Sequence, residues 1–402
     1  MYTPLSNELL LNTAKQYQTP LYVYDGDRIR SQYQRLNSAF SGVPVKIKYA
    51  LKACSNINVL KLLLSEGCGL DAVSINEVEL GILAGCKAEN ILFTPSGARF
   101  EEIEQAVERG VQINIDSLPV IEKFLEKYGS TKSCCVRVNP SIRAGGNKNI
   151  QTGHSDSKFG VPLAMIDRVV GLVKNKGLKV SGLHVHTGSD IYDPEVFVQG
   201  VRTLCGLAKD FPDLVYLDFG GGFKVPYKEG DPQADVENLG SLLKSEYDEF
   251  VSSYGRKIDV YFEPGKFLVS ESGYLLTEVT VVKETPNKTF VSVDSGLNHL
   301  IRPMMYGAYH HIENVSRPDA ASKTVDVVGN ICEEDTFASD RSIPDPLEGD
   351  LLSIRNAGAY GFSMSSNYNS RFRPAEVMIE SGQARLIRER ETLEDLLSKQ
   401  VL

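Results

Sequence analysis

No stretch of the 402-residue sequence approaches the ~18 consecutive apolar residues that a membrane-spanning helix needs. The N-terminus also lacks a basic segment followed by a long apolar run, so we expect no secretory leader. An excess of basic residues is missing too, because 43 Lys and Arg stand against 52 Asp and Glu and give a net charge of −9. Such a charge argues against a nucleic-acid partner. These absences predict a cytoplasmic protein with no membrane or nucleic-acid partner.

Cysteine is present, but without the spacing of a metal site. The seven cysteines are an odd number and form neither a CxxC pair nor a Cys/His ligand pattern. Reduced, mostly buried thiols therefore fit the sequence better than disulfides or structural zinc. Cys134 and Cys135 lie in an apolar run and are expected to be packing residues.

The length and composition indicate two folded domains. A chain of 402 residues is too long for one ordinary compact domain and suits a barrel of ~250 residues plus a second domain. Apolar residues make up 42% and charged residues 24%, which is typical of a soluble globular protein with a large core.

Between residues 44 and 263 a short β-prone run is repeatedly followed by a turn and a segment with helical spacing. Eight such runs are predicted strands: 44–52, 70–74, 91–94, 111–116, 133–139, 180–186, 214–219 and 259–263. One intervening helix is predicted from apolar residues at i, i+3 and i+4 spacing: Val236, Leu239, Leu243, Tyr247 and Phe250. Eight alternations favour a parallel (β/α)8 barrel, and a doubly wound sheet is the alternative.

After Ser270 the pattern changes to β-runs without long helices between them. The runs are LLTEVTVVKET, TFVSVD, TVDVVG, DLLSIR and AEVMIESGQARLIR, the last read as a hairpin turning at Ser381-Gly382-Gln383. A short helix is expected from Leu393 to Leu397. We therefore predict an α/β protein with a barrel over 26–269 and a β-rich domain formed by 1–25 and 270–402.

Polar residues stand at the predicted carboxyl ends of the barrel strands, where barrel enzymes carry their chemistry. They are Lys52, Asp71 with Ser74, Thr94, Asp116, Arg137, His186, Gly220-Gly221-Gly222 and Glu263. Burial would lower the pKa of Lys52 and make it a candidate amine nucleophile for Schiff-base chemistry. A solvated lysine is the alternative reading.

Two glycine-containing loops suggest an anion site. Gly220-Gly221-Gly222 follows an apolar strand and would let backbone N–H groups approach a phosphate, although such a triplet is often only a turn. Gly188-Ser189, after the sixth strand, would add a hydroxyl donor near the same rim. Together the loops predict a phosphate cup.

His184 and His186 share one side of their strand and could ligate a metal, which would suit a hydrolase barrel. The remaining histidines lie outside the predicted barrel strands, so we expect no metal. Glu263 ends the last strand, where a buried carboxylate needs a partner. That partner would be either a protonated pyridine nitrogen or a structural salt bridge.

In order along the chain, the motifs YALKACSN, GLHVHTGSD, LDFGGGF, FEPGK, LIRPMMYGAYH, GNICEED and NAGAYGFSMSSNYN resemble those of the fold-type III pyridoxal-phosphate decarboxylases. The resemblance runs from about Pro20 to Glu376. Within that family the motifs are most similar to those of the decarboxylases of meso-2,6-diaminopimelate, which implies L-lysine as the product. It also implies pyridoxal 5'-phosphate as the cofactor and a homodimer whose last two loops enter the partner's site.

The resemblance also implies roles for individual residues. Lys52 resembles the Schiff-base lysine, and Cys332 the thiol that acts as proton donor. The expected cofactor contacts are Lys52, His186 stacked on the ring, Glu263 at the pyridine nitrogen, Ser189, Gly222 and Tyr360 at the phosphate, and Pro264, Gly265 and Lys266. The expected substrate contacts are Lys266, Arg302, Tyr306, Glu333 and Tyr360.

The second amino-acid end of diaminopimelate needs an anion binder and an acid, which Arg302 and Glu333 would supply. Two positions depart from the family pattern. Lys266 stands where arginine is usual, and lysine cannot make a bidentate contact to a carboxylate or phosphate. Cys332-Glu333-Glu334-Asp335 is one residue shorter than the usual loop. A decarboxylase of carboxynorspermidine or a basic amino acid, a non-catalytic regulator and an alanine racemase are the alternatives.

Overall fold

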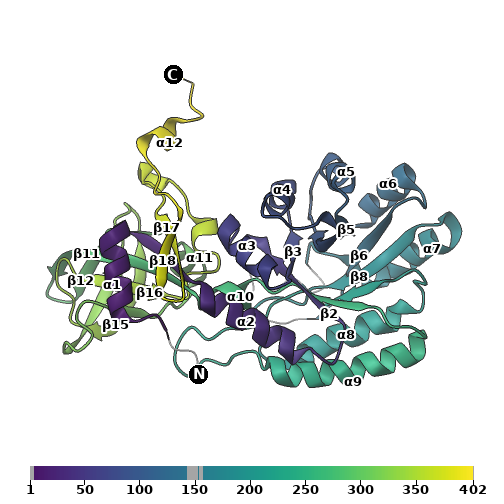
Figure 1. Ribbon diagram of the computed structural model, residues 1–402, viewed down its shortest axis with the longest axis horizontal. Helices are drawn as coiled ribbons and strands as arrows, with labels where there is room; N and C mark the ends of the chain where they lie inside the picture. Colours follow the sequence, from purple (N-terminus) through teal and green to yellow (C-terminus); the bar gives the residue numbers. More distant parts are fainter. Residues whose placement is uncertain (1–3, 143–152, 154–156, 402) are drawn as a thin grey trace. The chain divides into compact units, whose positions relative to one another are not determined.

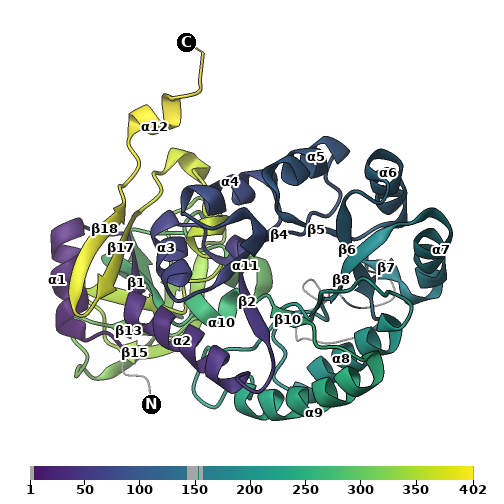
Figure 2. The ribbon, with the colours of Figure 1, turned by 45° about the vertical axis from the view of Figure 1, so that its right-hand side comes forward.

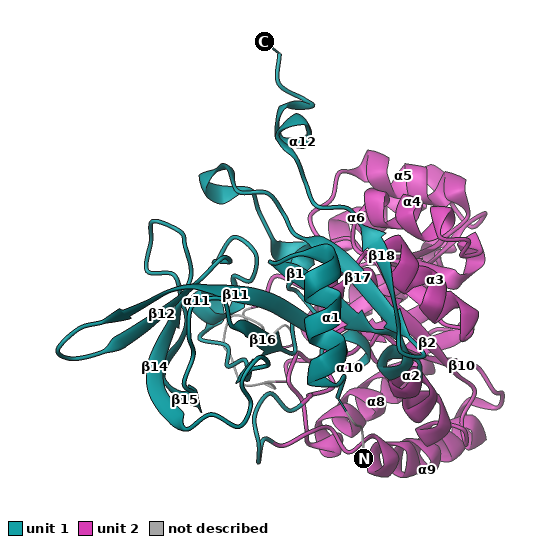
Figure 3. Ribbon diagram, turned by 60° about the vertical axis from the view of Figure 1, so that its left-hand side comes forward, with its two compact units in different colours: residues 1–30, 226–231, 268–402 teal, residues 31–225, 232–267 magenta. Residues whose placement is uncertain are grey.

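A computed structural model of the chain describes residues 4–142, 153 and 157–401. The chain forms two compact units (Figure 3). Unit 1 contains Met1–Arg30, Pro226–Asp231 and Leu268–Leu402, and unit 2 contains Ser31–Val225 and Pro232–Phe267. The domain boundaries expected from the sequence stay a prediction. His154, one of the histidines weighed as a metal ligand, lies outside the described residues.

Unit 2 is built on a closed parallel barrel. In the described residues its strands run in the order β5-β4-β3-β2-β10-β9-β8-β6, and β5 pairs with β6 to close the ring. The strands are β2 (Val45–Ala50), β3 (Gly69–Ala72), β4 (Ile91–Phe93), β5 (Gln112–Ile115), β6 (Ser133–Asn139), β8 (Lys179–Val185), β9 (Tyr216–Asp218) and β10 (Asp259–Phe262). A short strand, β7 (Val161–Pro162), pairs with β6. All eight strands predicted from the sequence are confirmed within the described residues, and the doubly wound alternative is wrong because the sheet closes.

Helices cover the outside of this barrel (Figure 2). They are α3 (Ile57–Ser65), α4 (Ile75–Leu83), α5 (Phe100–Arg109), α6 (Leu118–Tyr128), α7 (Ile166–Lys176), α8 (Pro194–Ala208) and α9 (Val236–Tyr254), while α2 (Gly26–Ala39) enters unit 2 at Ser31. The five apolar residues predicted to form one face of α9 are all buried. Helix α9 ends at Gly255, whose positive φ of 84° suits glycine.

Unit 1 is organised around a mixed sheet, shown in teal in Figure 3. Its described strands are β1 (Leu21–Asp25), β11 (Gly273–Glu284), β12 (Thr289–Val293), β13 (Ile312–Asn314), β14 (Ser322–Val328), β15 (Thr336–Pro344), β16 (Leu351–Arg355), β17 (Ala375–Glu380) and β18 (Gln383–Arg388). Strand β1 pairs antiparallel with β11 and parallel with β17, so the first strand of the chain lies inside this sheet. Helices α1 (Asn7–Tyr17), α11 (Arg302–Tyr306) and α12 (Leu393–Leu397) accompany the sheet, and α10 (Lys266–Val269) spans the boundary of the units.

The β-runs predicted after Ser270 are confirmed as β11, β12, β14, β16 and the β17–β18 hairpin, and the helix at 393–397 is confirmed as α12. The hairpin turns on Ser381 and Gly382, whose φ values of 50° and 76° belong to the left-handed region. The sequence did not predict β1, β13 or β15. Strand β15 is half exposed and its pairing with β14 is irregular, so it carries no regular alternation of apolar and polar residues.

Two sequence expectations concern the whole chain. Helices of the described residues are all too short or too polar to cross a membrane. All seven cysteines are free, and five of them are buried, including Cys134 and Cys135. The expected burial of Cys134 and Cys135 is confirmed.

Candidate functional site

Lys52 directly follows the carboxyl end of β2. It lies in a 3-10 turn, Leu51–Ala53, because the strand ends at Ala50 and not at residue 52 as predicted. Its side chain is exposed, so the expectation of a buried Lys52 is wrong. The buried lysine of this strand is Lys48, whose Nζ donates to the carbonyl of Asn90 at 3.0 Å. Burial lowers the pKa of Lys48 to about 8.

The glycine loops after β8, β9 and β10 lie in backbone contact. A Cβ on Gly221 would stand 2.2 Å from the carbonyl oxygen of Glu263, and one on Gly222 would stand 2.2 Å from that of Gly188. The carbonyl of Gly222 also accepts a hydrogen bond from the Ile191 N–H at 2.9 Å. Only glycine fits these approaches, so the triplet is a close-packed cradle and more than a turn.

His186 lies at the rim of the barrel next to that cradle. Its Nδ1 accepts a hydrogen bond from the Gly221 N–H at 3.2 Å, and its side chain is half-buried. Burial and the positive charges of Lys52 and Arg137 hold the pKa of His186 well below its usual range. Ser189 lies in the adjoining loop and is half-buried.

Glu263 follows β10 and is buried inside the barrel. Its Oε2 lies 3.3 Å from Nε2 of His184, and its N–H donates to the Gly220 carbonyl at 2.7 Å. Burial opposes the ionised form, but His184, His186 and Lys52 outweigh it and hold the pKa of Glu263 below its usual value. Glu263 is thus an ionised carboxylate in a low-dielectric interior.

The other predicted strand-end residues also lie in or next to the barrel. Asp71, Thr94, Asp116 and Arg137 are buried, whereas Ser74 is the N-cap of α4 and accepts a hydrogen bond from Glu77 N–H at 3.2 Å. Ser74 therefore has a structural role. Burial and the charge of Glu263 raise the pKa of Asp71 well above its usual value.

The structure changes the grouping of the histidines. Donor atoms of His184, Asp218 and Glu263 lie within 4.8 Å of one another, whereas His186 is not in that group. The Nδ1 of His184 lies 2.9 Å from Nδ2 of Asn114. Both ring nitrogens of His184 thus face polar side chains, Asn114 on one side and Glu263 on the other.

Lys266 begins α10, and its Nζ lies 2.6 Å from Oδ1 of Asp190. The side chain of Lys266 is 8% exposed and that of Asp190 is 23% exposed. Lys266, expected to contact the cofactor and the substrate, is therefore paired with a carboxylate of the protein itself. Asp190 adopts a φ of 62°, so the pair stabilises a strained residue in the loop after β8.

We expect Lys266→Ala to lower the free energy of unfolding by about 1–3 kcal/mol, because Asp190 would lose its charged partner. Lys266→Arg should be tolerated, since arginine keeps the charge. Urea unfolding of both variants measures the difference. Asp190→Ala in the Lys266→Ala background should recover part of the loss. A Lys266→Ala protein as stable as the parent would contradict this role.

Unit 1 surrounds a buried arginine with tyrosines. Arg302 begins α11, and its Nη2 donates to the Tyr227 hydroxyl at 3.3 Å. The guanidinium carbon lies 5.7 Å from the ring centroids of Tyr227 and Tyr360, and 5.9 Å from that of Tyr306. Nε of Arg302 is buried and has no hydrogen-bond acceptor in the part of the chain that the structure describes. This cluster brings together three predicted residues and suits a carboxylate ligand.

Cys332 and Glu333 lie on an exposed loop of unit 1. Sγ of Cys332 lies 3.2 Å from Nδ2 of Asn369, and Glu333 accepts a hydrogen bond from Tyr368 at 2.7 Å. Asp335 anchors this loop, because its buried carboxylate accepts the N–H groups of Leu297 and Ile331 at 2.7 and 3.0 Å.

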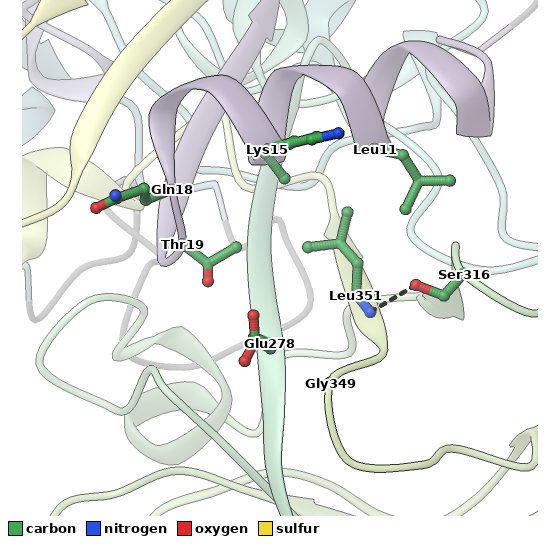
Figure 4. Close-up of a pocket in the computed structure, with 9 residues that line it drawn as sticks. Leu11, Lys15, Gln18, Thr19, Glu278, Ser316, Gly349 and Leu351 are labelled. Atoms are coloured by element: carbon green, nitrogen blue, oxygen red, sulfur yellow. Dashed lines mark hydrogen bonds between the residues drawn. The ribbon is translucent and has the colours of Figure 1, made fainter.

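Two pockets lie away from the predicted residues. Figure 4 shows one in unit 1, of about 450 Å³, between Leu11 and Lys15 of α1 and Glu278 of β11. Another, of about 370 Å³, lies at the amino ends of barrel strands, where Gln112 and Ser133 begin β5 and β6. Neither is lined by a predicted site residue.

Sequence reasoning missed Asp218 and Tyr227. Asp218 stands in an apolar strand, but it follows Tyr216 by two residues and precedes Gly220 by two. The two-residue period of a strand places these three residues on the same side, so it could have pointed to Asp218. Tyr227 offered none, because it contacts Arg302 from 75 residues away.

Residues 26–270 match the family model described as "Pyridoxal-dependent decarboxylase, pyridoxal binding domain". The chain belongs to the pyridoxal-dependent decarboxylases. It is 42% identical to a diaminopimelate decarboxylase of Methanothermobacter thermautotrophicus over 96% of this chain and 92% of that one. A Campylobacter jejuni diaminopimelate decarboxylase is 35% identical over 96% of each chain. A solved Helicobacter pylori diaminopimelate decarboxylase, complexed with L-lysine, has a TM-score of 0.89 at 34% identity and covers 97% of this chain and 98% of its own.

This membership agrees with the resemblance inferred from the motifs. It also decides between the enzyme classes that the sequence left open. A pyridoxal-dependent decarboxylase is an enzyme that removes a carboxyl group from an amino acid, so the metal-dependent hydrolase alternative is wrong.

Proposed function

We propose that this pyridoxal-dependent decarboxylase converts meso-2,6-diaminopimelate to L-lysine, the last step of lysine biosynthesis. The observation that carries the proposal is the likeness to diaminopimelate decarboxylases over 96% of the chain, at up to 42% identity among the relatives named above. The Arg302 cluster adds physical support, since this substrate has a second carboxylate that a buried guanidinium can bind.

The residues of unit 2 fit pyridoxal 5'-phosphate. The glycines of the cradle, Gly220, Gly221 and Gly222, leave no room for side chains, so the backbone of this loop can approach a phosphate. Glu263 is a buried carboxylate whose Oε1 lacks a hydrogen-bond partner among the described residues, which suits a cationic ring nitrogen. When bound, the cofactor supplies an electron sink for the pair of electrons left by the departing carboxyl group.

We assign a role to each residue near that group. Lys52 would carry the cofactor covalently, and His186 would stack on the ring. Glu263 would keep the ring nitrogen protonated. The phosphate would contact Ser189, Gly222 and Tyr360, and the loop Pro264, Gly265 and Lys266 would complete the binding residues. Lys266 would contribute to this binding loop by holding Asp190 in place, because its ammonium group lies against that carboxylate.

The substrate contacts we assign lie in unit 1. Arg302 would bind the distal carboxylate of diaminopimelate, and Tyr306 and Tyr360 would limit its movement. Glu333 would bind the distal ammonium group, and Cys332 would return a proton to the α-carbon. Both residues lie on an exposed loop, so they are accessible to a second copy of the chain. We therefore also propose a homodimer with shared active sites, working in the cytoplasm.

Incubating the cofactor-loaded protein with meso-diaminopimelate should release equal amounts of L-lysine and carbon dioxide. A panel containing ornithine, lysine, arginine and carboxynorspermidine separates the alternatives. We expect a kcat/KM for diaminopimelate at least about a hundredfold above the others, because a buried cation without its carboxylate remains unpaired. A higher value for another substrate would replace the proposed substrate, and inactivity on all of them would favour a regulatory protein.

A further inference from the structure

Asp218 of β9 is a buried carboxyl group to which the proposed function gives no role. Its exposed fraction is 0%, and its Oδ1 accepts the Gly220 N–H at 2.9 Å. Its Oδ2 has no hydrogen-bond partner in the described part of the chain, and Oε1 of Glu263 has none either. Donor atoms of Asp218 and Glu263 lie within 4.8 Å of each other. Two carboxyl groups this close in a dry interior do not both ionise readily.

The charges around the pair decide which group holds the proton. Glu263 has His184 3.3 Å from its Oε2, and Lys52 and His186 also favour its ionised form. Asp218 has no cation within ion-pairing distance in the described residues. Other charged groups near the pair are Asp71 of β3, Asp116 after β5 and Arg137 of β6, and the buried Lys48 of β2 also interacts electrostatically with Asp218. Burial and the charge of Glu263 raise the pKa of Asp218 well above its usual value.

We propose that Asp218 and Glu263 share a single proton, which resides on Asp218, and that neutral Asp218 donates a hydrogen bond to the Glu263 carboxylate. This proton gives a partner to both buried oxygens that lack one. Asp218 is then a positioning residue, which also fixes the start of the glycine cradle through Gly220. The inference rests on the proposed function, in which Glu263 faces the ring nitrogen of the cofactor.

The expected consequence concerns the basicity of Glu263. A carboxylate that accepts a hydrogen bond to its charged form becomes a weaker base. Glu263 with a donor from Asp218 therefore withdraws a proton less readily from the cation that it faces. The carboxylate has about four lone-pair sites, so this donor leaves it room for that cation.

The test compares Asp218→Asn with Asp218→Ala in the cofactor-loaded enzyme. Asparagine has the shape and charge of neutral aspartate, keeps an acceptor for Gly220 and keeps a donor for Glu263. We expect it to bind the cofactor and turn over within about threefold of the parent, because no charge is removed. Alanine should weaken cofactor affinity by about tenfold to a hundredfold, the range for losing a hydrogen bond to a charged group.

Infrared spectroscopy supplies the readout that a merely structural residue would not change. Burial also raises the pKa of Asp71, so the readout is a difference spectrum. The parent spectrum minus the Asp218→Asn spectrum at neutral pH should contain the carbonyl stretch of one protonated carboxylic acid. Asp235→Asn is the matched control, because it makes the same change at the exposed N-cap of α9 and should leave the band intact.

A difference spectrum without that band, or cofactor loss in Asp218→Asn as large as in Asp218→Ala, would overturn the proposal. A stoichiometric divalent metal that disappears in Asp218→Asn would also overturn it, since the same donor atoms would then hold an ion. Failure of the proposed function is distinguishable, because the infrared band and the cofactor affinity do not depend on which amino acid is decarboxylated.

Discussion

Lys52→Ala is expected to lose the visible absorbance of the cofactor-loaded protein and to lower turnover on diaminopimelate by on the order of a thousandfold or more. The reason is that Lys52 is the amine that follows β2 at the carboxyl end of the barrel, near the cluster of Asp71, Glu263 and His186 that its charge influences. Absorbance spectra and initial rates at saturating cofactor measure both effects.

The competing amine is Lys48, whose pKa burial lowers to about 8. A lowered pKa alone would therefore select the wrong lysine. The Lys48 ammonium donates to Asn90 and lies 4.7 Å from the ring centroid of Tyr261, so it is held among residues of the barrel wall. Lys48→Met should keep the absorbance, while Lys52→Ala loses it.

Two further variants separate chemistry from charge. Lys52→Arg keeps a positive charge near Glu263 but cannot bond covalently to the cofactor, so it should be as inactive as Lys52→Ala. Lys61→Ala, on the exposed face of α3, should behave like the parent. Substantial turnover in Lys52→Arg would reduce Lys52 to an electrostatic role.

The sequence predicted the barrel well because each strand carries its own local signal. A buried parallel strand is a short apolar run, and a following helix has apolar residues at i, i+3 and i+4. All eight strands predicted from this local signal are present in the described barrel. In unit 1 the signal was weaker, since β15 is half exposed and irregularly paired.

The candidate site was predicted less completely, because its geometry depends on contacts between distant segments. The strand before Lys52 ends two residues earlier than expected, and the resulting turn leaves the side chain exposed instead of buried. The tyrosines around Arg302 come from residues 227, 306 and 360. No local sequence pattern predicts such a cluster. Two of its tyrosines, Tyr306 and Tyr360, were predicted only from the motif resemblance.

The Cys332 loop is one residue shorter than is usual in the family, and the structure shows how the shorter loop is held. Asp335 is buried and holds two backbone N–H groups, so the end of the loop stays anchored while Cys332 and Glu333 remain exposed. Exposure of a proposed proton donor in a single chain is what an active site shared between two subunits requires. The proposed dimer then becomes testable through this residue.

Lys52→Ala and Cys332→Ala homodimers should each be nearly inactive, yet a mixture of the two should recover activity if each site takes Lys52 from one chain and Cys332 from the other. A two-fold dimer has an isologous interface, so a heterodimer of these variants contains one intact site and one site with both defects. Unfolding the variants together, mixing them equally and refolding them makes about half of the dimers heterodimers, which gives about a quarter of the parent activity.

The control is the same mixture without unfolding, which should stay inactive because the subunits have not exchanged. Native mass spectrometry of the refolded sample establishes that heterodimers are present. If they are present and the sample remains inactive, Cys332 serves its own chain or has no catalytic role. Recovery would instead require that the exposed loop of one subunit reaches the lysine of the other, since the interaction cannot form within either variant chain alone.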